Sequence, residues 1–184
     1  MPLQISIELT DKDLDHFRSV AHTAQQAVID GKVDRNEVAV EARKVFDEST
    51  KNTDLPEFIA TRLAKLEILV DMITDKEWQL PDDELNRVAG AMAYFAKPDD
   101  MIHDHIPGIG FLDDAIMVEL MVENLQDDID AYKEFCQFRE KESGIRARKG
   151  LDTDISKEDW MADQRAALHH RMRQRRNRRS SRVW

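Results

Sequence analysis

The fold is decided by residues 112–142, whose sequence is LDDAIMVELMVENLQDDIDAYKEFCQFREKE. Apolar residues recur there at steps of three and four, which is the spacing of one side of an α-helix. The stretch therefore predicts one long helix, and Gly144 predicts its end because glycine readily adopts the conformation that terminates helices. The buried side is predicted to consist of Val118, Val122, Leu125, Ile129, Tyr132 and Cys136.

The same stretch carries acidic residues that also recur at steps of three and four, on another side of the helix. Like charges at these spacings destabilise a helix modestly, so such a row calls for a physical explanation. The row is either a solvated face or a docking surface for a basic partner, including the chain's own C-terminal segment. We name it the acidic ridge, and it consists of Glu119, Glu123, Asp127, Asp130 and Glu134.

Four shorter helices are predicted before this one, each with its own start signal. Thr10 and Asp13 are typical of a helix N-terminus in which two side chains cap the backbone, and Gly31 predicts the end of that helix. Proline suits the first turn of a helix, where its missing N–H is not needed. The other three helices are predicted to begin near Asp34, Pro56 and Pro81, and the last of them to end before Pro98.

The first ten residues are predicted to form an extended arm. Residues 3–9 alternate apolar and polar side chains, which is the period of a β-strand. No second strand is predicted, and a lone strand would leave its backbone groups unpaired. We therefore favour an arm that lies on the helices, with a strand that pairs with its copy in a homodimer as the alternative.

Charge is distributed unevenly along the 184 residues. The net charge is −10, but residues 165–184 contain eight arginines and no acid, so residues 1–164 carry −18. The single cysteine excludes a disulfide framework within the chain and indicates a reducing compartment. The sequence opens without a basic and apolar leader, and no apolar run reaches the roughly 18 residues of a transmembrane helix. We expect a cytoplasmic protein without a transmembrane segment.

The C-terminal arginines are the strongest indication of a partner. After a linker at residues 143–155, residues 156–184 are predicted to form a basic helix or tail that projects from the bundle. Guanidinium groups at this density would neutralise phosphates, so the segment is expected to contact RNA, DNA or an acidic protein. The alternative is a solvated tail, or one docked on the acidic body. The candidate contacts are Arg171, Arg173, Arg175, Arg176, Arg178, Arg179 and Arg182.

A corner rich in proline and aspartate separates the fourth and fifth predicted helices, with the sequence KPDDMIHDHIPGIGFLDD at residues 97–114. Through this corner and its flanks, residues 85–125, the chain resembles the YkvA-like family, a bacterial helical domain of unknown function. His103 and His105 depart from the family's pattern. The resemblance implies a helical fold and brings no activity with it. The residues that follow the pattern are Pro98, Asp100, Met101, Ile102, Asp104, Ile106, Pro107, Gly110, Phe111, Leu112, Asp113 and Asp114.

Two interpretations of this corner stay open. In the first, proline and glycine shape the connection, while carboxylates cap the next helix and bind loop amides. In the second, carboxylates and imidazoles hold a divalent metal such as zinc, manganese or iron. The first is favoured because the Glu-x-x-His pairs of di-metal helical bundles do not occur, and no cofactor is expected. The candidate metal ligands are Asp100, His103, Asp104, His105, Asp113 and Asp114.

Taken together, the patterns predict an all-α protein, an irregular or orthogonal bundle of about five helices over residues 11–142. The arm precedes this bundle and the basic helix follows it. The favoured function is that of a non-enzymatic interaction or regulatory protein whose arginines contact a polyanion. One alternative is a metal-dependent enzyme that uses the Asp/His corner at residues 99–114. Another is a structural helical protein with a self-docked tail.

Overall fold

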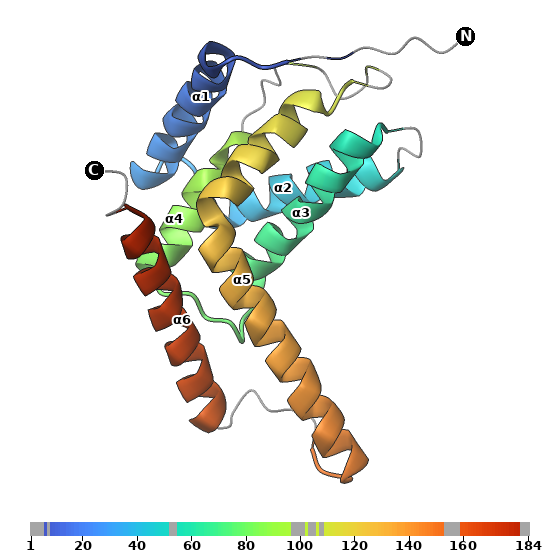
Figure 1. Ribbon diagram of the computed structural model, residues 1–184, viewed down its shortest axis with the longest axis vertical. Helices are drawn as coiled ribbons and strands as arrows, with labels where there is room; N and C mark the ends of the chain where they lie inside the picture. The colour runs from blue at the N-terminus through green and yellow to red at the C-terminus, as the bar shows by residue number, and fades with distance from the viewer. Residues whose placement is uncertain are drawn as a thin grey trace.

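The computed structural model describes residues 6, 8–51, 55–96, 102, 106, 109–152 and 159–180. Within these ranges the chain forms α-helices, one short 3-10 helix and no β-strand, which confirms the predicted all-α class (Figure 1). The α-helices are α1 (Asp11–Ile29), α2 (Arg35–Lys51), α3 (Glu57–Thr74), α4 (Asp82–Met92), α5 (Leu112–Arg148) and α6 (Asp159–Ser180), and the 3-10 helix η1 (Ala93–Ala96) continues α4.

The helix starts follow the local signals of the sequence. At the start of α1, the Thr10 backbone N–H donates to Asp13 Oδ2 at 2.9 Å, and the Asp13 N–H donates to Thr10 Oγ1 at 3.4 Å. This reciprocal pair satisfies two backbone donors that have no partner within the helix. Gly31 follows α1 with φ of +69°, and Pro56 and Pro81 directly precede α3 and α4 as predicted.

Helix α5 is longer than predicted, because it continues through Gly144 to Arg148. A glycine inside a helix costs only about 1 kcal/mol relative to alanine, which does not stop a helix that is otherwise well supported. The helix ends at Arg148, and Gly150, two residues further on, has φ of +66°. The N–H groups of Gly150 and Leu151 donate to the carbonyls of Ala147 and Arg146, the pattern of a Schellman motif. The first part of the predicted linker is therefore helical.

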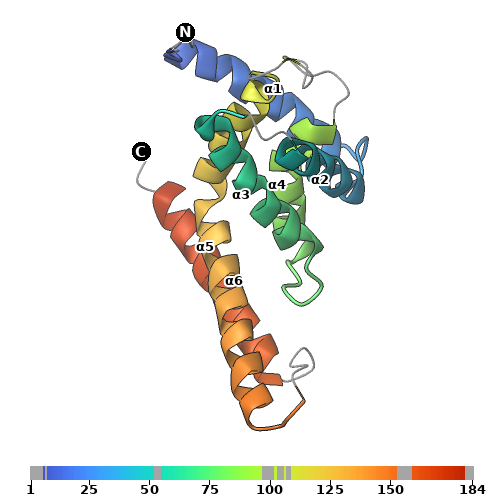
Figure 2. The same ribbon diagram turned by 90° about the vertical axis from the view of Figure 1, so that its right-hand side faces the viewer.

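Helix α5 is the central element of the bundle. Helix α3 packs along it, α2 packs on α3, and α1 packs on α4 and η1. Figures 1 and 2 show that the N-terminal half of α5 lies among these helices, whereas its C-terminal half extends beyond them beside α6. The predicted buried side is confirmed for Val118, Val122, Leu125, Ile129 and Tyr132, and Cys136 is half-buried.

Helix α6 packs antiparallel against α5 and does not project from the protein, so that prediction is wrong for residues 159–180. The reason is a narrow apolar stripe within the basic sequence. Met161, Leu168 and Met172 follow one another at steps of seven and four, which places them on one side of the helix. All three are buried. Burying them stabilises the docked helix by roughly 1.5–3 kcal/mol for each side chain.

Some predictions fall outside the described residues. Residues 1–5 and 7 of the arm are among these, while Ser6 and residues 8–10 are exposed and have no regular secondary structure. The arm, the homodimer and the division into domains therefore stay predictions. No helix in the described ranges is both long enough and apolar enough to cross a bilayer.

Candidate functional site

The structure describes part of the proline- and aspartate-rich corner. Asp113 and Asp114 lie in the first turn of α5 and are buried. The Gly110 N–H donates to the Ile106 carbonyl at 2.9 Å, which forms the turn before α5. Carboxylates in the first turn of a helix also interact favourably with its dipole. The candidate residues Pro98, Asp100, His103, Asp104, His105 and Pro107 lie outside the described residues, as does Met101 of the same pattern.

Asp113 connects the two sides of this corner. Its Oδ2 atom accepts a hydrogen bond from the Tyr94 hydroxyl at 2.8 Å and another from the Ile102 N–H at 3.1 Å. Tyr94 belongs to η1, so the carboxylate holds the end of the α4 unit against the start of α5. In the part of the chain that the structure describes, no group of three or more potential ligands could hold a metal ion. The metal site stays a prediction.

The arginines of α6 contact a second cluster, which we name the arginine seat. It consists of Glu84 of α4 and of Asp127 and Asp128 of α5, which are all buried. Arg176 donates two hydrogen bonds to Glu84, from Nη1 to Oε2 at 2.6 Å and from Nη2 to Oε1 at 2.7 Å. This two-pronged geometry matches the planar guanidinium to the planar carboxylate, and it is the strongest form of such a pair.

Arg87 of α4 completes the charge compensation of the seat. Its Nε atom donates to Glu84 at 3.3 Å, and its Nη2 atom is hydrogen-bonded to Asp128. The Nη1 atom of Arg176 also lies 3.7 Å from Asp128. Two carboxylates and two guanidiniums thus share one half-buried volume between α4, α5 and α6. Charges taken out of water require such pairing, because an isolated buried charge costs several kcal/mol.

The two central carboxylates respond differently to this environment. Burial acts to raise the pKa of Glu84, but hydrogen bonds and charges from Arg176 and then Arg87 outweigh it and hold that pKa below its usual range. For Asp128, burial is the stronger influence and raises the pKa, against the charges of Arg87 and Arg176. Glu84 is therefore the carboxylate that keeps its charge to the lower pH.

Two weaker ion pairs flank the centre of the seat and involve the acidic ridge. Arg179 lies 3.2 Å from Asp127, and Arg171 lies 2.8 Å from Glu134. The second pair is about half exposed on both sides, so water and salt screen it strongly. Another ridge residue, Glu119, instead receives Lys65 of α3 at 3.1 Å. The other two, Glu123 and Asp130, are exposed.

A second anchor holds α6 near its middle. His169 is buried, and its ring contacts the fully buried Trp78 edge to face at 4.3 Å between centroids. Arg165 Nη1 donates to the carbonyl of Glu77 at 2.8 Å. Both contacts reach the segment between α3 and α4. Helix α6 is thus attached to three parts of the chain: α5, the start of α4 and the segment before it.

The half-buried thiol of Cys136 belongs to this neighbourhood. Burial raises its pKa, and this outweighs the opposing effects of Tyr132 and Arg139. A raised pKa leaves little thiolate at neutral pH, and the thiolate is the reactive form of cysteine. These properties accord with the predicted packing role of Cys136 on the apolar side of α5.

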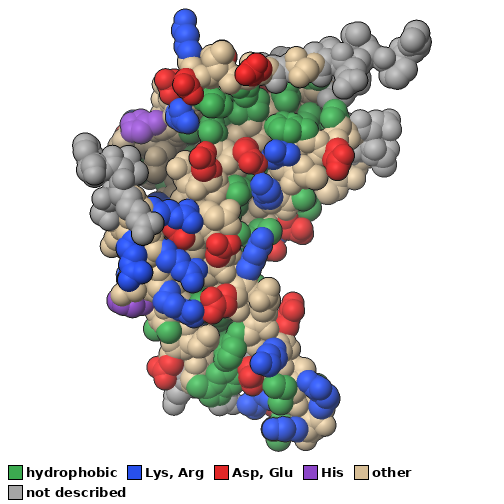
Figure 3. Space-filling model, viewed as in Figure 1, with side chains coloured by type: hydrophobic (Ala, Val, Ile, Leu, Met, Phe, Trp, Pro, Cys, Tyr) green, Lys and Arg blue, Asp and Glu red, His purple; other side chains and the backbone are tan. Residues whose placement is uncertain are grey.

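The arginines of α6 divide between two faces. Arg176 and Arg179 point to the seat, as does Arg173, whose Nε atom lies 4.0 Å from Glu84. A further set is exposed and follows steps of four and three, which places it along one line of the helix. We name it the outer row, and it consists of Arg171, Arg175 and Arg178. Figure 3 shows basic side chains gathered over α6 beside acidic ones of α5. Arg182 lies outside the described residues.

Sequence reasoning missed the two carboxylates at the centre of the seat. Asp128 follows Leu125 by three positions and precedes Tyr132 by four, so its place on the buried side could have been recognised from helical spacing. Glu84 could not be recognised in this way. It stands in the acidic first turn of α4 beside Asp82 and Asp83, where carboxylates are usual for the helix dipole alone.

Comparison with known proteins finds one family. A family described as "Protein of unknown function (DUF1232)" matches residues 87–120, which run from α4 through the corner into the first turns of α5. This match confirms the predicted YkvA-like resemblance over that segment. No curated protein and no solved structure matches the chain.

Proposed function

We propose that the chain is a non-enzymatic interaction protein whose helical bundle is a scaffold and whose helix α6 contacts a phosphate-bearing polyanion, RNA or DNA. The observation that supports this most is the division of the α6 arginines. Arg176 and Arg179 pair with buried carboxylates of the seat, while Arg171, Arg175 and Arg178 lie in one line as exposed side chains, and Arg171 also pairs with the exposed Glu134. A line of guanidiniums on one helix face is suited to follow successive phosphates.

The seat supports this proposal because it orders the helix in advance. A disordered arginine segment must lose conformational entropy when it binds, whereas a docked helix has already lost it. The remainder of the protein carries a large negative charge and repels polyanions. Contact is therefore expected at the outer row alone, with an affinity that falls steeply as salt is added.

The second candidate is a structural role, in which α6 closes the bundle and has no external ligand. This role is favoured by the pairs of Arg176 with Glu84 and of Arg87 with Asp128, because pairs inside the protein can stabilise the fold without any external ligand. The metal-dependent enzyme is the third candidate and rests on the Asp/His corner. Asp113 already accepts hydrogen bonds from Tyr94 and Ile102, which supports a structural task for that carboxylate.

Fluorescence anisotropy with single-stranded RNA and duplex DNA, over a salt series, tests the first candidate. We compare the full chain with the double variant Arg175→Gln/Arg178→Gln. The variant is expected to bind about tenfold more weakly at low salt and to lose nearly two units of the slope of log affinity against log salt. The matched control is Lys12→Gln/Lys141→Gln, which removes the same charge from exposed positions of α1 and α5 and should lose much less. If the full chain binds neither probe, or if both double variants lose equally, the proposal is wrong.

The structural candidate is tested by Glu84→Gln. Removing this charge takes away one of the two carboxylates that Arg176 and Arg87 share, while Asp128 remains beside both. Because both guanidiniums are also partly exposed, we expect a loss of at most about 3 kcal/mol, at the low end for a broken buried pair. Urea denaturation measures the loss in the free energy of unfolding. Asp83→Asn is the matched control, because Asp83 is the exposed neighbour in the same helical turn and should change stability by less than about 0.5 kcal/mol. Equal stability of Glu84→Gln and the parent chain would contradict a stabilising role of the seat.

A further inference from the structure

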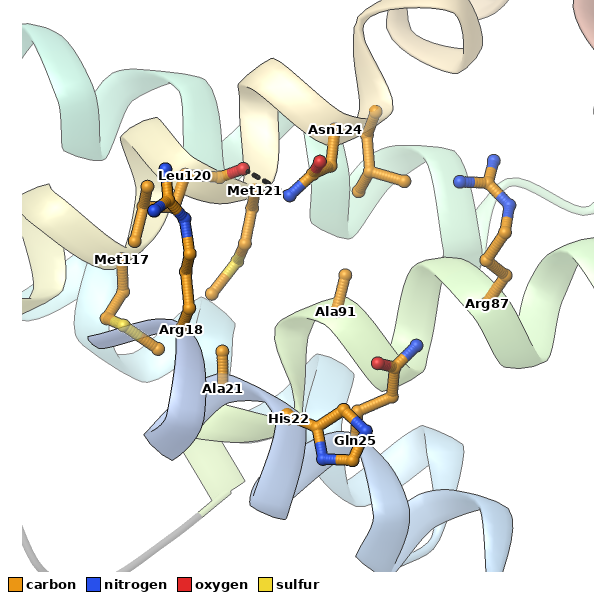
Figure 4. A pocket seen from close by; sticks show the side chains of 11 residues that line it. Arg18, Ala21, His22, Gln25, Arg87, Ala91, Met117, Leu120, Met121 and Asn124 are labelled. Atoms are coloured by element: carbon orange, nitrogen blue, oxygen red, sulfur yellow. Dashed lines mark hydrogen bonds between the residues drawn. The ribbon is translucent and has the colours of Figure 1, made fainter. Parts of the chain in front are cut away.

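A cavity of about 290 Å³ lies between α1, α4 and α5, and Arg87 connects its rim to the arginine seat (Figure 4). Its floor is apolar and is made by Met117, Met121 and Leu125 of α5, which are all buried. Ala21 of α1 and Ala91 of α4 face it from the other two helices. Their short side chains leave the space open, and the long methionines can adapt to the shape of an occupant.

The rim of this cavity is polar and rich in hydrogen-bond donors. Arg18, His22 and Gln25 come from α1, Arg87 from α4 and Asn124 from α5. Among the described residues, no aspartate or glutamate lines the cavity. This lining is unusual on a body with a large excess of acidic residues. An apolar floor below a cationic, donor-rich rim is complementary to a ligand with an apolar body and an anionic head.

The guanidiniums of Arg87 and Arg18 at the rim differ in how strongly carboxylates bind them. Arg87 is committed to the carboxylates of Glu84 and Asp128 in the seat. Among the described acids, Arg18 pairs with the nearby Asp15, at 3.0 Å, and both side chains of this pair are more than half exposed. An exposed pair of this kind contributes at most about 1 kcal/mol, so a ligand can displace Asp15. In Figure 4 the Arg18 side chain rises along one side of the cavity, beside Met117 and toward Leu120.

The geometry of α1 against α4 keeps the cavity in shape. Gly90 of α4 allows the Gln25 side chain to approach closely, since a Cβ atom at Gly90 would lie 3.0 Å from Gln25 Cγ. Two of the three helices that form the walls, α4 and α5, contribute residues of the segment that matches the family of unknown function. The third wall, α1, supplies Arg18 and lies outside that segment.

We propose that this cavity binds a small amphipathic monocarboxylate, with its alkyl part on the methionine floor and its carboxylate at Arg18. The volume of about 290 Å³ lies just below the range of about 300–1,000 Å³ that is usual for small-molecule sites, so the occupant has a short alkyl chain. A carboxylate accepts two parallel hydrogen bonds from one guanidinium, which gives the head a defined place. The site is independent of the polyanion contact proposed for α6.

Titration of the full chain with octanoate tests the proposal, with octan-1-ol as a neutral probe of matched apolar length. Calorimetry measures the affinities, and spectra of protein labelled with [methyl-¹³C]methionine locate the ligand. We expect octanoate to shift the methyl signals of Met117 and Met121 and to bind about tenfold more tightly than octan-1-ol at pH 7. Arg18→Gln should abolish this preference for the carboxylate and leave octan-1-ol binding unchanged. Lys12→Gln, an exposed charge on the same helix, should leave both affinities unchanged.

Ala91→Leu provides a second variant that does not depend on charge. The larger side chain extends into the cavity and should abolish binding of both probes, while circular dichroism shows that the helices remain. The proposal is overturned if octanoate leaves the two methionine signals unmoved up to millimolar concentration. It is also overturned if Arg18→Gln keeps the preference for octanoate, or if Ala91→Leu binds both probes as the parent chain does.

Discussion

Arg176 and Glu84 stand 92 positions apart in the sequence, yet they form the best hydrogen-bonded ion pair that holds α6. The pairing compensates the burial of Glu84, since an isolated buried charge would cost several kcal/mol. Arg87 adds a second donor to the same carboxylate, which lowers the pKa of Glu84 further. At the scale of single residues, one anchor of α6 is thus a carboxylate whose cationic neighbours offset the cost of its burial.

His169 should make the stability depend on pH in a defined window. Burial lowers its pKa to about 4, and the charges of Arg173 and Arg165 add to this effect, so the imidazole is neutral at pH 7. In the unfolded chain its pKa is near 6.5. Between these values the unfolded state binds the proton and the folded state does not, so the free energy of unfolding falls as pH falls. The full loss is on the order of 3 kcal/mol.

Urea denaturation between pH 7.5 and pH 4.5 measures this dependence. His169→Gln should flatten it, whereas His170→Gln, at the exposed neighbouring position, should retain it. The pKa values of Asp75 and Glu84 are also lowered, but their titration lies below this window. An unchanged slope in His169→Gln would show that the buried imidazole is not the source.

At the scale of elements, helix ends illustrate how local signals compete. Gly144 and Gly150 are close together and are both glycines, but only the second ends α5. At Gly150 the backbone enters the left-handed region, and the N–H of Leu151 then reaches the carbonyl of Arg146. The completed Schellman pattern satisfies carbonyls that the helix leaves without partners. The hydrogen-bond pattern, and not the glycine alone, decides where the helix stops.

Substitution of these two glycines by alanine should have opposite effects on stability. Gly144→Ala is expected to raise the free energy of unfolding by up to about 1 kcal/mol, because a Cβ there meets no atom within 4 Å and alanine favours helix. Gly150→Ala should lower it by about 1–2 kcal/mol, because φ of +66° is unfavourable for a residue with a Cβ. Urea unfolding followed by helical circular dichroism measures both. Effects of the same sign would contradict this assignment of the helix end.

At the scale of the whole molecule, α5 joins two structural regions. Its N-terminal half is buried among α1 to α4, and its C-terminal half extends beyond them beside α6, with further contacts from Tyr132 and Arg139 to the segment between α3 and α4 (Figure 2). The pair of α5 and α6 is held by a few apolar side chains and by the ion pairs of the seat. Elements with few buried contacts open at lower cost than a core does. We therefore expect α6 to detach before the bundle unfolds.

Leu168→Ala tests this order of opening. Leu168 is 1% exposed, and truncating a buried leucine costs roughly 2–5 kcal/mol. Hydrogen exchange should accelerate throughout α6 and in the facing turns of α5, while α1 to α4 keep their protection. Asn177→Ala, at an exposed position of the same helix, serves as the control and should leave exchange near that of the parent chain. Acceleration spread evenly over all helices would instead show one cooperative unit.

The sequence by itself determined the all-α class, most helix starts and the buried side of α5. These depend on contacts between near neighbours, such as Thr10 with Asp13, or on the helical period, and both can be read along the chain. The charged centre of the seat was decided only by the tertiary structure, as were the docking of α6 and the cavity beside Arg18. The residues that form these features come from helices far apart in the sequence. A charged side chain such as Glu84 is stable in water until another helix covers it. Long-range packing therefore decides whether such a side chain is buried or solvated, because only packing brings the oppositely charged partner that burial requires.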